Sequence, residues 1–121
     1  MPDVGRVVSG VKRALTPGLL QEPYRSRVLS GQCDPMTGHC YVASEAAYHL
    51  LGGKQRGWVP VFVRHEGSPH WFLRGPGGQI VDITASQFRT PVPYEKGVAK
   101  GFLTRKPSAR ARLVMAGAQP L

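Results

Sequence analysis

Apolar residues recur along the chain at two spacings, one typical of helices and one typical of strands. Near the amino end they follow each other at three- and four-residue steps, which places them on one face of a helix. These residues are Val4, Val7, Val8, Val11 and Leu15. The pattern predicts a first helix that stops at TPG, residues 16–18, because proline and glycine interrupt helices. Residues 19–35 are irregular, and we expect loop there with one short helix at residues 24–29.

The best-defined predicted element is a second helix over residues 37–51. One apolar stripe runs along it, made of Ala43, Ala46, Ala47, Leu50 and Leu51. Thr37 or Gly38 can cap its start, and the glycines at 52–53 supply the left-handed backbone that commonly ends a helix. We expect the stripe to pack on a sheet as part of the core. Cys40 then lies in the first turn of this helix.

Three runs rich in β-branched and aromatic residues follow, at residues 58–64, 70–74 and 79–84. Each run predicts a strand. The segment GPGG, residues 75–78, is typical of a hairpin turn between the last two. The segment HEGSP, residues 65–69, is typical of a turn between the first two.

After residue 88 the pattern is irregular until Pro107 and Ser108, where proline suits the first turn of a helix. This last predicted helix carries Leu113, Val114 and Met115. The order of a helix, antiparallel strands and a terminal helix predicts an α+β fold, because a doubly wound sheet needs strict alternation of strands and helices. A length of 121 residues suits one core, so we expect residues 1–121 to form a single domain.

The hydropathy pattern indicates neither a membrane span nor a secretion signal. No apolar run approaches the roughly 18 residues that a span requires, and the amino end has no continuous apolar stretch. We therefore expect a cytoplasmic protein, in which Cys33 and Cys40 are reduced thiols. A disulfide between these two cysteines is the alternative.

The chain is strongly basic, with a formal net charge of +9 from 16 Lys and Arg against 7 Asp and Glu. Between Arg89 and Arg112 lie seven basic residues and a single acid, Glu95. Such a surface attracts nucleic acid, nucleotides or an acidic partner protein. The alternative is a solvated basic face with no dedicated ligand.

Cys40 is the first candidate for chemistry. The first turn of a helix points unpaired N–H groups at the residue there, which stabilises a thiolate and can also stabilise the oxyanion of a tetrahedral intermediate. A nucleophilic thiol also requires a base, and the base an orienting partner. Downstream, His70 opens one predicted strand and Asp82 lies in the next.

The segments GHCYVASEAAYHLLGG, HWFL and VDITASQF resemble, in this order, the papain-like cysteine hydrolases. They are most similar to small bacterial and phage proteins related to the YunG-like group, in which a cysteine leads a helix ending in Gly-Gly and a His precedes aromatic residues. The resemblance covers residues 37–88, and residues 101–111 look like a further shared tail. It implies a papain-like α+β fold in which the cysteine-bearing helix packs on a small antiparallel sheet.

The same resemblance implies the site residues and the reaction. Cys40 would be the nucleophile, His70 the general base and acid, and Asp82 the residue that holds the imidazole. The reaction would be hydrolysis or acyl transfer at an amide, isopeptide or ester bond of a protein, peptide or other acyl substrate. Papain itself has a glutamine shortly before the cysteine to stabilise the oxyanion, whereas Gln32 lies eight residues upstream here. His39, Gln32 and Gln87 are therefore all candidates for the second oxyanion donor.

Each of these residues also has a simpler interpretation. Cys40 could be a small buried side chain beside alanines, and His70 a polar strand residue. Asp82 could organise the turn that follows it. His65 is a rival base, but because HEGSP is typical of a turn we expect it to be solvent-exposed. A non-catalytic interaction protein of the phage type, which uses the basic face, is the alternative function.

Metal binding is the competing chemistry for the same residues. The N and S ligands on offer are Cys33, His39, Cys40, His49, His65 and His70. Two cysteines separated by six residues and followed by scattered histidines fit none of the usual zinc spacings. We expect neither a metal nor another cofactor.

Whether His70 and Asp82 can meet depends on the register of the predicted hairpin. Opposed residues of a hairpin point to the same side, and side chains alternate along each strand. A loop with an odd number of residues, 75–77 or 74–78, places Asp82 opposite His70, whereas a loop over 75–78 sends it to the other face. We expect the odd register, with the second imidazole nitrogen facing Cys40 at roughly 3 to 4 Å.

Overall fold

The computed structural model describes residues 3–16, 19, 22, 24–31, 39–102 and 105–118. Gln32 and Cys33 lie outside these residues, and so do Thr37 and Gly38. The oxyanion role of Gln32 and the expectations for Cys33 are therefore not tested.

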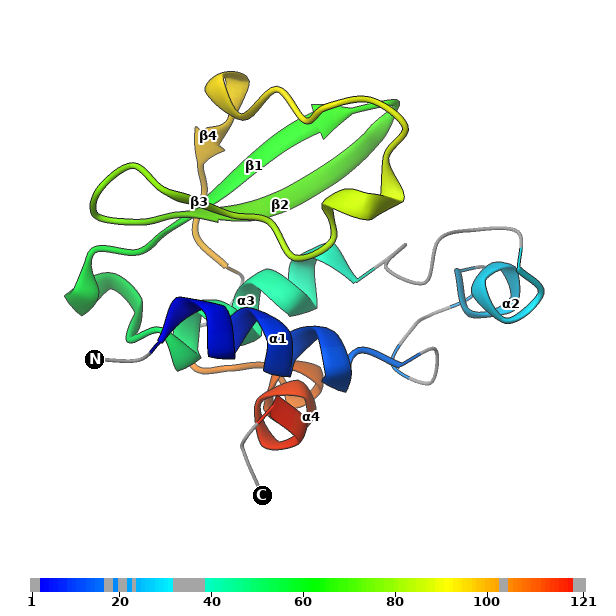
Figure 1. Ribbon diagram of the computed structural model, residues 1–121, viewed down its shortest axis with the longest axis horizontal. Coiled ribbons are helices and arrows are strands. Elements are labelled where there is room, and N and C mark those ends of the chain that lie inside the picture. The colour runs from blue at the N-terminus through cyan, green and yellow to red at the C-terminus, as the bar shows by residue number, and fades with distance from the viewer. Residues whose placement is uncertain are drawn as a thin grey trace.

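The described residues form a layer of three helices on one face of a four-stranded antiparallel sheet, and a fourth, short helix stands apart from the sheet in Figure 1. The helices are α1 (Val4–Ala14), α2 (Tyr24–Leu29), α3 (Cys40–Leu50) and α4 (Ala109–Ala118). The strands are β1 (Val59–His65), β2 (Ser68–Arg74), β3 (Ile80–Val81) and β4 (Val98–Ala99), in the order β3-β2-β1-β4. The expected α+β class is confirmed. No described helix is long and apolar enough to cross a membrane.

Helix α1 forms where its apolar spacing predicts it, and Asp3 caps it by accepting a hydrogen bond from the Arg6 amide. It packs on α3 and α4. Gly10 lowers helix propensity but is required at this crossing, because a Cβ there would lie 2.6 Å from the Ala118 carbonyl oxygen of α4. The short helix expected at residues 24–29 is also confirmed as α2.

Helix α3 lies between the sheet on one side and α1 and α4 on the other. The predicted start was wrong, because His39 and not Thr37 or Gly38 is the N-cap residue. The predicted stop is confirmed, since Gly52 and Gly53 both have positive φ. Most of the predicted stripe is buried, but Leu50 is only partly buried.

A buried carboxylate joins α3 to α4. Glu45 is 1% exposed, and its two oxygens accept hydrogen bonds of 2.8 Å from the amide and the hydroxyl of Ser108. The Ser108 hydroxyl in turn accepts from the Ala111 amide, as an N-cap residue does. The last helix therefore begins near Pro107 and Ser108, as predicted.

Strands β1 and β2 form a hairpin whose two turn residues, Glu66 and Gly67, both have positive φ. Because the turn is this short, Ser68 and Pro69 belong to β2, and the predicted start of that strand at residue 70 was wrong. Strand β4 was not predicted, because two residues are too few to produce a recognisable pattern.

Strand β3 is much shorter than the predicted run over residues 79–84, since the chain leaves the sheet after Val81. Arg74 pairs with Ile80, so the loop spans residues 75–79. Its odd length confirms the parity that we expected, but both loops proposed from the sequence were wrong. Continued by one residue, this register places Asp82 opposite Phe72, which is one diagonal step from His70.

The sheet is covered on both faces. The main core lies between the helices and one face, and includes Leu51 and Leu73. On the other face a smaller cluster of Val61, Val63, Phe72 and Val92 is closed by the segment over residues 85–97, which crosses the sheet in Figure 1. This covering segment contains the 3-10 turns η3 (Ala85–Gln87) and η4 (Tyr94–Lys96); a third such turn, η2 (Gly53–Arg56), follows α3.

Candidate functional site

Three separate elements bring Cys40, His70 and Asp82 together. Cys40 is the first residue of α3, His70 lies within β2, and Asp82 directly follows β3. His70 points to the sheet face that the covering segment closes, because it is paired with Val63 of the smaller cluster. The amino end of α3 lies beside β2, where Cys40 Sγ is 3.9 Å from the Pro69 carbonyl oxygen.

His70 and Asp82 form a buried hydrogen-bonded pair. The Nε2 atom of His70 lies 2.8 Å from Oδ2 of Asp82, and their side chains are 0% and 3% exposed. Tyr94 of the covering segment donates its hydroxyl to the same Oδ2 at 2.9 Å. Burial, the charge of Asp82 and this hydrogen bond raise the pKa of Tyr94, which therefore remains a donor. Both hydrogen bonds therefore converge on one oxygen of the carboxylate.

The surroundings of His70 raise its pKa above the ordinary value. Burial lowers its pKa, but hydrogen bonds to Asp82 and to the Cys40 side chain, together with the charges of both, raise it to about 9. Because Nε2 is bonded to Asp82, Nδ1 is the nitrogen left for Cys40. The imidazole therefore interacts with both the carboxylate and the Cys40 side chain.

Cys40 is a free, partly exposed thiol at a helix start. The first-turn amides of α3 have no carbonyl four residues back within the helix, so they can stabilise negative charge on the sulfur or on a nearby oxygen. A reagent can reach the sulfur, and a negative charge on it would be balanced by His70.

Gln87 joins the site from the covering segment. Its side-chain nitrogen is 3.5 Å from Nδ1 of His70 and donates to the Thr84 hydroxyl at 3.2 Å. The neighbouring Phe88 packs its ring against the His70 ring with 4.7 Å between centroids. Of the three candidates for the second oxyanion donor, the structure brings Gln87 beside the imidazole.

Neither His39 nor His65 forms a hydrogen bond with Cys40, His70 or Asp82 among the described residues. His39 is fully buried, its Nε2 has no hydrogen-bond partner among the described residues, and burial lowers its pKa. The expectation that His65 is exposed was wrong, because its side chain is 13% exposed and bonds Thr90. The hydrogen bonds of His65 go to Thr90 and not to Cys40.

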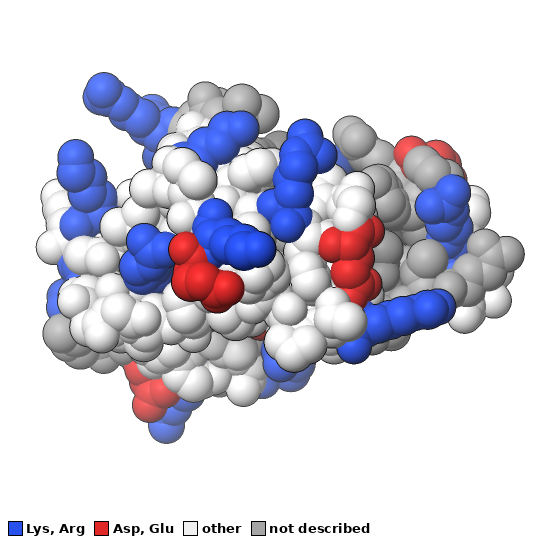
Figure 2. All heavy atoms as spheres, turned by 90° about the horizontal axis from the view of Figure 1, so that it is seen from above, with Lys and Arg blue, Asp and Glu red and all other residues white. Residues whose placement is uncertain are grey.

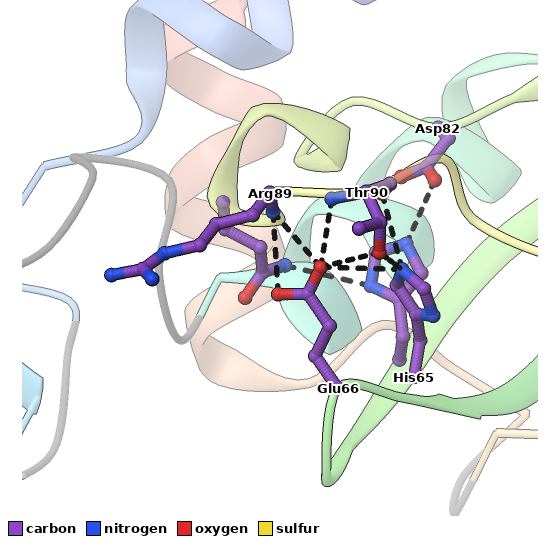
Figure 3. Close-up of polar contacts among 7 residues, drawn as sticks. His65, Glu66, Asp82, Arg89 and Thr90 are labelled. Atoms are coloured by element: carbon purple, nitrogen blue, oxygen red, sulfur yellow. Dashed lines mark hydrogen bonds and ion pairs between the residues drawn. The ribbon is translucent and has the colours of Figure 1, made fainter.

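Two contributors, Tyr94 and Glu66, were not predicted. The Tyr94 hydroxyl reaches Asp82 from the covering segment. Glu66 lies at the hairpin tip and accepts hydrogen bonds from Arg89 and Thr90 of the covering segment (Figure 3). No short motif signals either contact, since the partners are 12 to 24 residues apart.

Within the described part of the chain, no group of three or more His, Cys, Asp or Glu side chains is arranged to hold a metal ion. A scan against protein-family models gives no match, and searches of curated proteins and of solved structures give none either.

Proposed function

We propose that the protein is a cysteine hydrolase or acyl-transfer enzyme that acts on an amide, isopeptide or ester bond. Cys40 is the nucleophile, His70 the general acid and base, and Asp82 the residue that orients the imidazole and balances its charge. One observation carries the proposal: the buried His70 bonds the Asp82 carboxylate through Nε2 and also interacts with the side chain of Cys40 at the start of a helix.

The raised pKa of His70 defines the resting state. At neutral pH the imidazolium interacts with Cys40, where its positive charge can balance the negative charge of the attacking sulfur. Attack on the carbonyl carbon forms a C–S bond and an oxyanion. The first-turn amides of α3 and the side-chain amide of Gln87 supply donors for that oxygen.

His70 then moves the protons. Its Nδ1 proton passes to the leaving nitrogen or oxygen as the old bond breaks, which leaves an acyl-thioester on Cys40 and a neutral imidazole. The imidazole next takes a proton from water or another acceptor, which attacks the thioester and releases the thiolate. Asp82 remains ionised throughout and accepts the hydrogen bond from Nε2.

The order of motifs supports a family assignment within the same proposal. The segments around Cys40, His70 and Asp82 resemble papain-like cysteine hydrolases and the YunG-like group, and a helix that begins with the cysteine and packs on an antiparallel sheet suits such a domain. We therefore propose a papain-like fold.

Thiol labelling tests the proposal. Iodoacetamide at neutral pH should alkylate Cys40 much faster than Cys33, as measured by mass spectrometry of peptides from the intact protein. His70→Ala should remove most of this difference, because the imidazolium no longer stabilises the thiolate. Equal, slow labelling of both cysteines in the wild-type protein would contradict an activated nucleophile.

A second candidate function is nucleic-acid binding, because most of the described acidic side chains are engaged in hydrogen bonds within the chain while basic side chains occupy the surface. Five of the six described acidic side chains accept hydrogen bonds within the chain; they are Asp3, Glu22, Glu45, Glu66 and Asp82. The face viewed in Figure 2 carries Lys and Arg side chains over most of its width. An exposed surface of this kind attracts phosphates.

Binding of a fluorescent DNA of generic sequence tests this second function. Affinity should fall steeply as salt rises, because bound counterions are released on binding. If no binding is seen at low salt, an acidic protein partner is the remaining form of the interaction hypothesis. The Cys40→Ala variant should bind as the wild type does, which separates this function from the catalytic one.

A further inference from the structure

The covering segment contributes Gln87 to the site, yet around Gln87 it has no strand to hold it in place. Its anchor lies at the tip of the β1–β2 hairpin (Figure 3). Oε2 of Glu66 accepts hydrogen bonds from the Arg89 amide at 3.0 Å, the Thr90 amide at 2.8 Å and the Thr90 hydroxyl at 2.6 Å. One carboxylate therefore fixes two consecutive residues of the segment.

His65 strengthens the same anchor. Its Nε2 lies 3.0 Å from the Thr90 hydroxyl oxygen and 3.1 Å from the Thr90 carbonyl oxygen. Since a carbonyl can only accept, Nε2 carries the hydrogen, and the Thr90 hydroxyl is free to donate to Glu66. Both hairpin residues thus hold Thr90, and the positive φ of Glu66 is part of the tight turn that places them there.

The anchor acts on the site through two neighbouring residues. Phe88, next to Arg89, packs edge-on against His65 and His70, with ring centroids 4.9 and 4.7 Å apart. Gln87 precedes it and lies beside Nδ1 of His70. Holding residues 89–90 therefore fixes where the Gln87 amide can point.

We propose that Glu66 is a positioning residue, which holds residues 89–90 so that the Gln87 amide stands beside His70 as an oxyanion donor. This role rests on the proposed function of Cys40 and His70. Glu66 itself is not catalytic, because its hydrogen bonds go to Arg89 and Thr90 and not to the reacting groups.

Two reactions of Cys40 separate positioning from general damage. Acetylation by p-nitrophenyl acetate forms the thioester C–S bond, passes through an oxyanion and expels p-nitrophenolate, so it needs the donor. Alkylation by iodoacetamide is a direct displacement of iodide with no oxyanion. Loss of the Gln87 donor should slow the first reaction and spare the second.

The test compares Glu66→Ala with Glu95→Ala, a matched control that removes the same charge from an exposed side chain of the covering segment. Glu66→Ala should slow acetylation about tenfold or more, which is less than the roughly hundredfold or more for outright removal of an oxyanion donor because Gln87 itself is still present, and leave alkylation within about twofold of wild type. Glu95→Ala should change neither rate. Thr90→Val should show the same split more weakly, because it keeps the backbone hydrogen bond to Glu66.

A double variant completes the test. In a Gln87→Ala background, Glu66→Ala should cause no further loss of acetylation, since both changes remove the same donor. Unchanged acetylation in Glu66→Ala, an equal loss of both reactions, or additive losses in the double variant would each overturn the positioning role. Slow alkylation of Cys40 in the wild-type protein would instead refute the proposed function itself.

Discussion

Replacing Asp82 by asparagine should lower the pKa of His70 from about 9 to below its ordinary value of 6.5. Asparagine keeps the shape of the side chain and an oxygen that can accept the Nε2 hydrogen of His70. It removes the negative charge and weakens the hydrogen bond that favours the imidazolium. Burial, which lowers the pKa, then outweighs the remaining contribution of Cys40.

The expected magnitude follows from the size of the shift. A rise from 6.5 to about 9 corresponds to about 3 to 4 kcal/mol in favour of the protonated imidazole within the fold, at about 1.4 kcal/mol per pKa unit. Asp82 supplies much of it, because its hydrogen bond to His70 is 2.8 Å long and both side chains are buried. At neutral pH the variant should therefore carry a mostly neutral imidazole, and alkylation of Cys40 should slow markedly.

Titration of the imidazole C–H signals by NMR measures this directly, with a His70→Ala spectrum for assignment. Burial lowers the pKa values of His39 and His49, and neither should change in Asp82→Asn, so they are internal controls for the fold. If His70 in the variant titrates at its wild-type midpoint while these two signals are unchanged, Asp82 does not hold the imidazolium. The reasoning behind the charge-balanced site would then be refuted.

Four further substitutions test the packing and the chemistry, with stability measured by urea unfolding. Leu51→Ala should lower the free energy of unfolding by about 2 to 5 kcal/mol, because Leu51 is 2% exposed. Leu50 is only partly buried, so Leu50→Ala should lower it by less than about 2 kcal/mol. The reverse order would mean that the buried face of α3 is misplaced. Ser108→Ala should cost about 0.5 to 2 kcal/mol, because it removes the α4 cap and one donor to Glu45; an unchanged midpoint would argue against the cap. Cys40→Ala should unfold like the wild type but lose any acyl transfer, and retained activity would exclude Cys40 as the nucleophile.

The sequence predicts the elements with regular periodicity well, because apolar side chains that recur at a fixed spacing all face the same core. Helix α1 and the stop of α3 at Gly52 fall where the pattern places them. Strand β4 and most of the covering segment carry no repeat, so contacts with distant residues determine their path. Lys100 shows this, since its amide reaches the carbonyl of Pro60 to continue the pairing of β4 with β1.

The same distinction applies to the candidate site, in which some residues could be predicted from the sequence and others could not. Cys40, His70 and Asp82 could be chosen from residue type, order and spacing, whereas alternation along the strands left two faces open to Asp82 and only the expected triad favoured the face of His70. Tyr94 and Glu66 could not be chosen, because their hydrogen bonds depend on the path of a segment without periodicity. A tyrosine or an exposed glutamate can have many structural roles, and the sequence alone does not distinguish between them.

The early end of β3 explains how the site is accessible at all. In the observed register a strand continued to residue 84, as predicted, would pair with β2 as far as His70. Such a strand would occupy the side of β2 next to Pro69, where Cys40 now lies 3.9 Å from the carbonyl oxygen. Because the chain instead turns after Val81, the start of α3 can approach β2, and η3 can carry Gln87 back over His70. The one large error in the predicted strands is therefore the feature that lets helix, strand and covering segment meet at a single imidazole.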